Sequence, residues 1–178
     1  MEQGTTRVRP AQETDMPALA RIYAHYVLHS TCTFELEPPS AADMAARFRT
    51  VTGRSGPFLV AQCGEAIVGY AYAGPYRDRP AYRHTVESSV YLDPACVGRG
   101  IGRQLMGELV RAATGGEFLQ MVAVIGDSAN HASIRLHESL GFRRVGVLVD
   151  VGFKHGKWVD TVLMQRRLCR TCLTDTAS

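Results

Sequence analysis

The chain has 178 residues, 46% of them hydrophobic, which is enough to bury one core without disulfides or a structural metal. Its 20 Lys and Arg against 17 Asp and Glu give a net charge of +3, too small for a nucleic-acid-binding surface. The sequence has no apolar leader segment and no run of about 20 apolar residues, so we expect a cytoplasmic protein without membrane or nucleic-acid partners.

The first part of the chain predicts one strand and two helices. Residues 6–11 favour a short strand, and residues 14–30 carry apolar side chains at helical spacing, with Thr14 as the expected N-cap. A second helix is predicted from Ser40, which can cap it, to Gly53, which ends it. This part of the chain therefore supplies two amphipathic helices in succession.

The rest of the chain predicts mostly strands, separated by two helices. The last predicted strand before the second of these helices is mostly apolar without alternation, which favours a strand covered on both faces in a parallel arrangement. Together with the first part, the element order is β-α-α-β-β-β-α-β-α-β-β, typical of one α/β domain with mixed strand directions over about residues 6–168. The expected elements are a hairpin turning at Gly64-Glu65, a strand at 84–92, a helix at 100–114, a strand at 117–125, a helix at 130–142 closed by Gly141, strands at 144–153 and 159–168, and a loose tail.

The five cysteines do not predict a disulfide framework, because their number is odd and their spacing is scattered. Cys169 and Cys172 form a single C-x-x-C pair without a second pair. We therefore expect two thiols on the tail and no metal site.

Three glycines, Gly98, Gly100 and Gly102, stand within five positions where the helix at 100–114 begins. A glycine inside a helix costs about 1 kcal/mol relative to alanine. The first turn of a helix has unpaired N–H groups and a positive dipole end, and glycines let phosphate oxygens approach the backbone. The spacing does not fit the dinucleotide fingerprint, which needs glycine in place of Arg103, and no Gly-Lys-Ser/Thr follows as in a P-loop. The glycines alone indicate either an anion site or a flexible turn.

Two longer stretches carry a resemblance to a known family. "VESSVYLDPACVGRGIGRQLM" and "NHASIRLHESLGF" resemble the central motif and the second motif of the GNAT acyltransferases, and the resemblance extends over about residues 6–168. It implies a mixed, mostly antiparallel sheet flanked by helices, with acetyl-CoA as co-substrate and no metal. Within that superfamily, five blocks in order resemble the phosphinothricin/methionine sulfoximine N-acetyltransferases: "TFELEP", "RDRPAYRHTVESSVY", "VAVIGD", "RLHESLGF" and "GFKHGKWVD".

The resemblance also implies which residues hold acetyl-CoA. Val97 departs from the family pattern, since it stands where a Gln or Arg is usual, and we expect altered rather than lost affinity. Asn130 also stands where a helix N-cap is expected, so capping alone can explain it. The implied cofactor-binding residues are Val90, Leu92, Val97, Gly98, Arg99, Gly100, Ile101, Gly102, Asn130 and Ser133.

Glu87 is the candidate general base. Strand alternation places Glu87 on one face with Ser89 and Tyr91, where pattern alone slightly favours a paired or solvated carboxylate. The resemblance implies the base, which the chemistry needs because an amine is protonated near neutral pH. The N–H of Val90 can stabilise the oxyanion. His137 lies where many relatives carry a tyrosine acid; it can act as acid, assist the base, or only pack.

The loop at 76–84 contains three arginines and one aspartate, which favours either a carboxylate-binding site or a solvated surface. The resemblance implies substrate binding by Phe34, Arg77, Arg79, Tyr82 and Thr85, and a homodimer formed through the last strands, with Trp158 packing there. The expected reaction is direct transfer of an acetyl group to the α-amino group of methionine sulfoximine, methionine sulfone or phosphinothricin. The alternatives are another acceptor, such as a protein N-terminus, or a non-catalytic acyl-CoA sensor.

Overall fold

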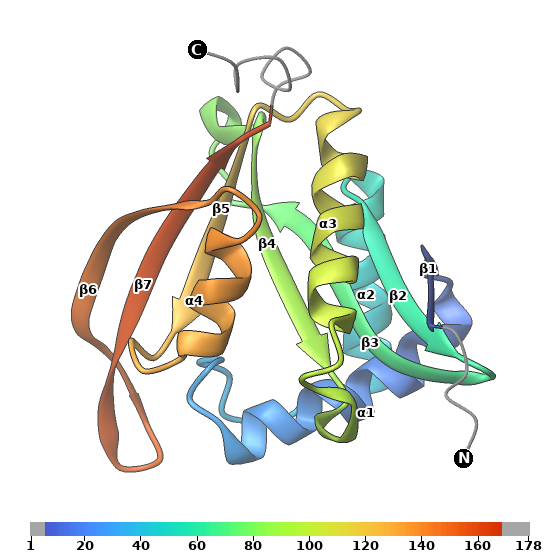
Figure 1. Ribbon diagram of the computed structural model, residues 1–178, viewed down its shortest axis with the longest axis horizontal. Helices are drawn as coiled ribbons and strands as arrows, with labels where there is room; N and C mark the ends of the chain where they lie inside the picture. The colour runs from blue at the N-terminus through green and yellow to red at the C-terminus, as the bar shows by residue number, and fades with distance from the viewer. Residues whose placement is uncertain (1–5, 169–178) are drawn as a thin grey trace.

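The computed structural model describes residues 6–168, which form one seven-stranded sheet in the order β1-β2-β3-β4-β5-β7-β6 (Figure 1). Neighbouring strands are antiparallel except β4 and β5, which are parallel. This architecture confirms the expected fold and element order. The strands are β1 (Thr6–Pro10), β2 (Phe58–Cys63), β3 (Ala66–Pro75), β4 (Thr85–Leu92), β5 (Gln120–Gly126), β6 (Arg143–Lys154) and β7 (Lys157–Arg167).

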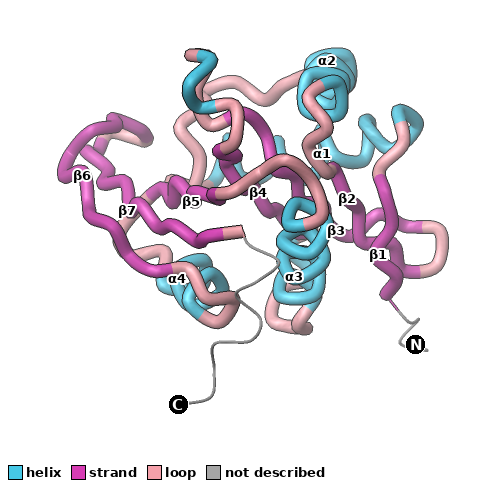
Figure 2. Tube along the Cα trace, turned by 90° about the horizontal axis from the view of Figure 1, so that it is seen from above, coloured by secondary structure: helices cyan, strands magenta, loops and turns pink. Residues whose placement is uncertain are grey.

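Within residues 6–168, four α-helices cover the two faces of the sheet (Figure 2). α1 (Met16–His29) and α2 (Ala41–Gly53) pack on one face, and α3 (Ile101–Thr114) and α4 (His131–Glu138) on the other. Each face has its own apolar core, because each helix buries a stripe at helical spacing, as Leu105 and Leu109 do on α3. No helix within residues 6–168 is long and apolar enough to cross a membrane. Cys169, Cys172 and the expected tail lie outside the described residues.

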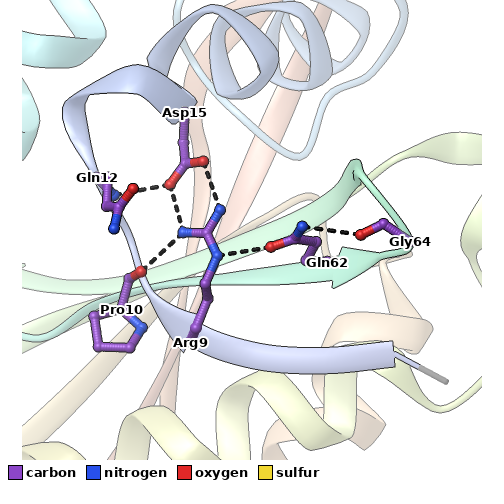
Figure 3. A network of polar contacts seen from close by, with 6 residues as sticks. All are labelled: Arg9, Pro10, Gln12, Asp15, Gln62 and Gly64. Atoms are coloured by element: carbon purple, nitrogen blue, oxygen red, sulfur yellow. Dashed lines mark hydrogen bonds and ion pairs between the residues drawn. The ribbon is translucent and has the colours of Figure 1, made fainter.

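The start of α1 differs from the expectation, because Thr14 does not cap it. A 3-10 turn, η1 (Glu13–Asp15), comes first, and Asp15 accepts a 2.8 Å hydrogen bond from the Gln12 N–H. The same carboxylate pairs with both terminal nitrogens of Arg9, each at 2.8 Å, and Arg9 Nε donates to Gln62 on β2 (Figure 3). A buried carboxylate thus closes the turn before the helix begins.

The caps expected for α2 are confirmed. The Ser40 hydroxyl accepts a hydrogen bond from the Asp43 N–H at 3.2 Å, and the Asp43 side chain accepts one from the Ser40 N–H at 2.9 Å. The helix ends at Gly53. The reciprocal bonds satisfy N–H groups that a helix start leaves unpaired.

The parallel strands β4 and β5 separate part-way along their length (Figure 1). Their last paired residues are Ser88 and Ala123, although β4 continues to Leu92 and β5 to Gly126. The expectation that β5 is covered on both faces is wrong, because its side chains alternate between buried and half-buried. Val124 is half-buried since it borders the cavity that the separation opens.

Candidate functional site

The separation of β4 and β5 opens a cavity of about 520 Å³, called here the split cavity. Its walls come from β4 and β5, the loop before α3, the first turns of α3 and α4, and the end of α1. The Tyr26 hydroxyl donates a 2.7 Å hydrogen bond to the carbonyl of Leu92, which ties α1 to the end of β4. The cavity is therefore a groove between strands rather than a gap between domains.

The glycine loop at the mouth of this cavity needs glycine for its backbone conformation. Gly98 has φ of 76° and Gly100 has φ of 79°, in the left-handed region that side chains disfavour. A Cβ on either would meet no atom within 4 Å, so protein packing does not explain them. The first hydrogen bond of α3 runs from Gln104 N–H to Gly100 O, which leaves the N–H groups of residues 101–103 without an intrahelical acceptor. This arrangement fits a phosphate group.

Most of the residues predicted to hold the cofactor line the split cavity. Arg99, Gly100 and Ile101 are not among its lining residues and continue the loop at its edge. The Asn130 side chain caps α4 by accepting a 3.2 Å hydrogen bond from the Ser133 N–H, so capping accounts for that side chain. The predicted residues that line the cavity are Val90, Leu92, Val97, Gly98, Gly102, Asn130 and Ser133.

The peptide group of Val90 faces the open side of β4. Peptide groups along a strand alternate between its two neighbours. The carbonyl of His84 accepts hydrogen bonds from residues 119 and 120 on the β5 side, whereas the carbonyl of Thr85 bonds to Tyr76 on the β3 side. By alternation the Val90 N–H points toward β5, beyond the last β4–β5 pair, where the ladder offers it no acceptor.

His137 also lines the split cavity and is 3% exposed. Its Nδ1 lies 2.8 Å from the carbonyl of Ser133, so Nδ1 carries the proton and donates. Among the described residues, its buried Nε2 has no hydrogen-bond partner. Burial lowers the pKa of His137, opposed by the bond to Ser133, so the ring is neutral near pH 7 and Nε2 is an acceptor there. A neutral ring suits a proton acceptor better than an acid.

Glu87 points to a different cavity, of about 360 Å³, called here the Glu87 cavity. No hydrogen bond or ion pair joins its carboxylate to any residue within 6–168. Burial raises the pKa of Glu87, and the positive charge of Arg77 opposes that rise. Ser89, two residues further along β4, borders both the Glu87 cavity and the split cavity. The two cavities therefore meet at β4.

Four of the five predicted substrate residues gather in a third cavity of about 340 Å³, called here the arginine cavity. It adjoins the Glu87 cavity, because Val51 and Pro75 line both. Phe34 is not among the residues lining any of these three cavities. Its ring instead occupies the space that a side chain at Gly152 of β6 would need. The predicted residues in the arginine cavity are Arg77, Arg79, Tyr82 and Thr85.

The sequence analysis missed residues of α2 and β3 that line the Glu87 cavity, above all Arg47 and Tyr72. A signal existed for Arg47. Met44, three residues before Arg47, and Val51, four residues after it, are buried on the same face of the helix as Arg47. An arginine within an apolar helix face is unusual unless it contacts a partner or a ligand.

Comparison with known proteins places this geometry in a family. Residues 8–163 match the model of the acetyltransferase (GNAT) domain. A phosphinothricin N-acetyltransferase of Alcaligenes faecalis is 48% identical over 161 residues, covering 90% of this chain and 82% of the relative. An L-methionine sulfoximine/L-methionine sulfone acetyltransferase of Salmonella typhimurium is 37% identical, covering 90% of this chain and 94% of the relative.

A solved structure is similar to this chain in fold as well as in sequence. It is a GNAT superfamily phosphinothricin acetyltransferase from Sinorhizobium meliloti in complex with AcCoA. It superposes with a TM-score of 0.90 at 44% identity, covering 98% of this chain and 94% of that one. With the β4–β5 split, the glycine loop and these relatives together, the chain belongs to the GNAT acetyltransferases, in the group that includes the phosphinothricin and methionine sulfoximine N-acetyltransferases.

Proposed function

We propose that this protein is a single-domain cytoplasmic enzyme that transfers the acetyl group of acetyl-CoA to the α-amino group of a small amino acid. The acceptors proposed are methionine sulfoximine, methionine sulfone and phosphinothricin, which the names of its relatives include. One observation carries the proposal. On a single strand, Glu87 faces one cavity, the Val90 N–H faces the other, and Ser89 between them borders both.

The split cavity fits the cofactor. The N–H groups at the start of α3 and the left-handed backbone at Gly98 and Gly100 would hold the diphosphate, and the groove between β4 and β5 would take the pantetheine arm. When bound, acetyl-CoA supplies a thioester whose carbonyl the amine attacks. Val97 is 54% exposed beside this loop and brings no donor, so main-chain N–H groups carry more of the binding.

The residues on β4 then divide the chemistry between them. Glu87 takes one proton from the acceptor's ammonium group, directly or through water, and the free amine attacks the thioester carbon. The Val90 N–H donates to the oxyanion of the tetrahedral intermediate. As that intermediate collapses, the carbon–sulfur bond breaks and the nitrogen's second proton goes to the departing thiolate. The products are the acetamide, CoA thiol and one proton on Glu87.

A coupled screen tests the proposal. Release of CoA thiol is measured with acetyl-CoA against a panel of amino acids, their sulfoximine, sulfone and phosphinate analogues, a peptide N-terminus and an aminoglycoside. We expect turnover with the analogues and little with the peptide or the aminoglycoside. Calorimetry with CoA is run in parallel. CoA binding without turnover of any amine supports a sensor, and absence of CoA binding by folded protein refutes both readings.

The exposed face of β6 supports a homodimer. β6 is the edge strand of the sheet and carries a run of exposed apolar side chains, which soluble proteins usually cover. Light scattering should report a dimer that Val149→Asp converts to monomers, whereas Leu119→Asp, at another exposed apolar residue away from β6, leaves it intact. A monomeric parent protein would refute the proposal. The exposed residues are Val145, Val147, Leu148, Val149, Val151 and Phe153, with Trp158 on β7.

A further inference from the structure

Arg47 is held in a fixed position on α2. Its Nη2 donates a 2.8 Å hydrogen bond to Oε1 of Glu35, and its guanidinium carbon lies 5.3 Å from the centre of the Tyr23 ring. The side chain is 26% exposed, so one part of it remains open. A guanidinium has five N–H donors, and the bond to Glu35 uses one of them. Arg47 can therefore bind a ligand without first being ordered.

The open part of Arg47 faces the Glu87 cavity. The other lining residues are Thr50, Val51, Tyr72, Gly74, Pro75, Glu87 and Ser89. Among them, Arg47 is the single cation and Glu87 the single anion. They come from different elements, Arg47 from α2 and Glu87 from β4. A small cavity lined by one charge of each sign, on two different elements, matches a zwitterion.

We propose, on the basis of the proposed function, that Arg47 binds the α-carboxylate of the acceptor while Glu87 receives its α-ammonium group. The two charged groups of an α-amino acid are attached to one carbon atom, so both fit within this cavity. The planar guanidinium fork matches the two oxygens of a carboxylate. The side chain of the acceptor then extends toward Arg77 and Arg79 in the adjoining arginine cavity.

This arrangement makes a free carboxylate the feature by which the enzyme selects its substrates. A peptide N-terminus or a simple amine has the nucleophile but lacks the adjacent anion. Such an acceptor would leave Arg47 without its ligand and would be acetylated slowly. The substrate class is therefore free α-amino acids with a polar side chain.

The test compares charged and neutral acceptors on one pair of variants. Arg47→Met keeps most of the side-chain volume and removes the charge, and Arg49→Met is the matched control, since Arg49 lies on the same helix, 60% exposed, and pairs with Glu13. Because Arg47→Met leaves the acceptor carboxylate without its cation, we expect kcat/KM for methionine sulfone to fall about 30-fold or more, through a higher KM for the acceptor. The KM for acetyl-CoA stays unchanged. Methionine sulfone amide has a neutral carboxamide in place of the carboxylate. For this acceptor, kcat/KM of the parent and of Arg47→Met should agree within about threefold.

Four outcomes overturn the inference. If Arg47→Met has the same kcat/KM for methionine sulfone as the parent, no carboxylate binds at Arg47. If kcat/KM falls equally for methionine sulfone and for its amide, Arg47 only shapes the cavity. Arg47→Lys, which keeps the positive charge, replaces Arg47→Met if that variant does not fold. We expect it to lower kcat/KM for methionine sulfone by a smaller factor and to leave kcat/KM for the amide unchanged. An equal loss of kcat/KM with the amide also overturns the inference. A parent enzyme that turns over methionine sulfone keeps the proposed function whatever the variants do, and a parent that turns over no amine refutes both.

Discussion

Glu87→Gln removes a proton acceptor while keeping the size and shape of the side chain. The carboxylate has no hydrogen bond or ion pair with the residues that the structure describes, and only the charge of Arg77 acts on it, so the melting temperature should stay within about 2 °C of the parent value. A positioned general base contributes about 10²–10⁴-fold to a rate. We therefore expect kcat to fall by that factor, about 3–5 kcal/mol of transition-state stabilisation, with the KM for acetyl-CoA unchanged.

The pH dependence identifies Glu87 more specifically than the rate alone. A base works only when deprotonated, so kcat/KM of the parent should fall as pH falls through the pKa of Glu87. Burial raises that pKa above its ordinary 4.5, and Arg77 opposes the rise. Arg77→Met should therefore move the acid limb to higher pH, and Glu87→Gln should abolish it.

The assay is initial-rate thiol release at saturating acetyl-CoA between pH 5 and 9, with unfolding monitored at each pH. Glu87→Asp is a useful comparison, since it keeps the carboxylate but withdraws it from the cavity. A Glu87→Gln variant that keeps kcat within about threefold of the parent, with the same acid limb, would refute the assignment and move the base elsewhere.

Three further changes test the structure around the site. Gly100→Ala places a side chain at φ of 79°, costs about 1–2 kcal/mol and should weaken CoA binding in calorimetry; unchanged affinity would contradict the loop assignment. Asp15→Asn should lower the free energy of unfolding in urea by about 1–3 kcal/mol at pH 7. Because Arg9 holds the pKa of Asp15 below its usual range, that stabilisation is complete above the unfolded pKa and is lost as pH falls through the lower, folded pKa. A difference in free energy of unfolding between parent and variant that persists at pH 2 would contradict this assignment. Gly126→Ala places a Cβ 2.6 Å from the carbonyl oxygen of Thr31 and should cost about 1–3 kcal/mol in thermal unfolding; an unchanged melting temperature would contradict that contact.

Sequence predicted what short-range chemistry determines. The cap at Ser40, the end at Gly53 and the turn at Gly64 depend on neighbours a few residues away, and the structure confirms all three. The start of α1 was missed because the Asp15 carboxylate is engaged by Arg9 of β1, a contact that no helix-capping rule contains.

Contacts between distant segments explain the remaining differences. Nothing local to β4 or β5 indicates that their pairing stops at Ser88, since that depends on how α4 and α1 pack around the gap. Phe34 is placed by Gly152, more than a hundred residues later. Arg47 and Glu87 line one cavity only because α2 packs against β3, the strand beside β4. The roles predicted for Glu87 and for the arginines of the loop at 76–84 came from the family resemblance and not from the periodicity of the sequence.

The position of Ser89 on the border of two cavities has a consequence for the order of events. The Glu87 cavity is lined by α2, β3 and β4, whereas the split cavity is lined by β5, α3, α4 and the end of α1, with β4 common to both. In the proposed reaction, donor and acceptor would therefore occupy different cavities and meet at β4. Acetylated product in the Glu87 cavity would then leave while CoA stays bound in the split cavity, and CoA should inhibit without competing against the amino acid.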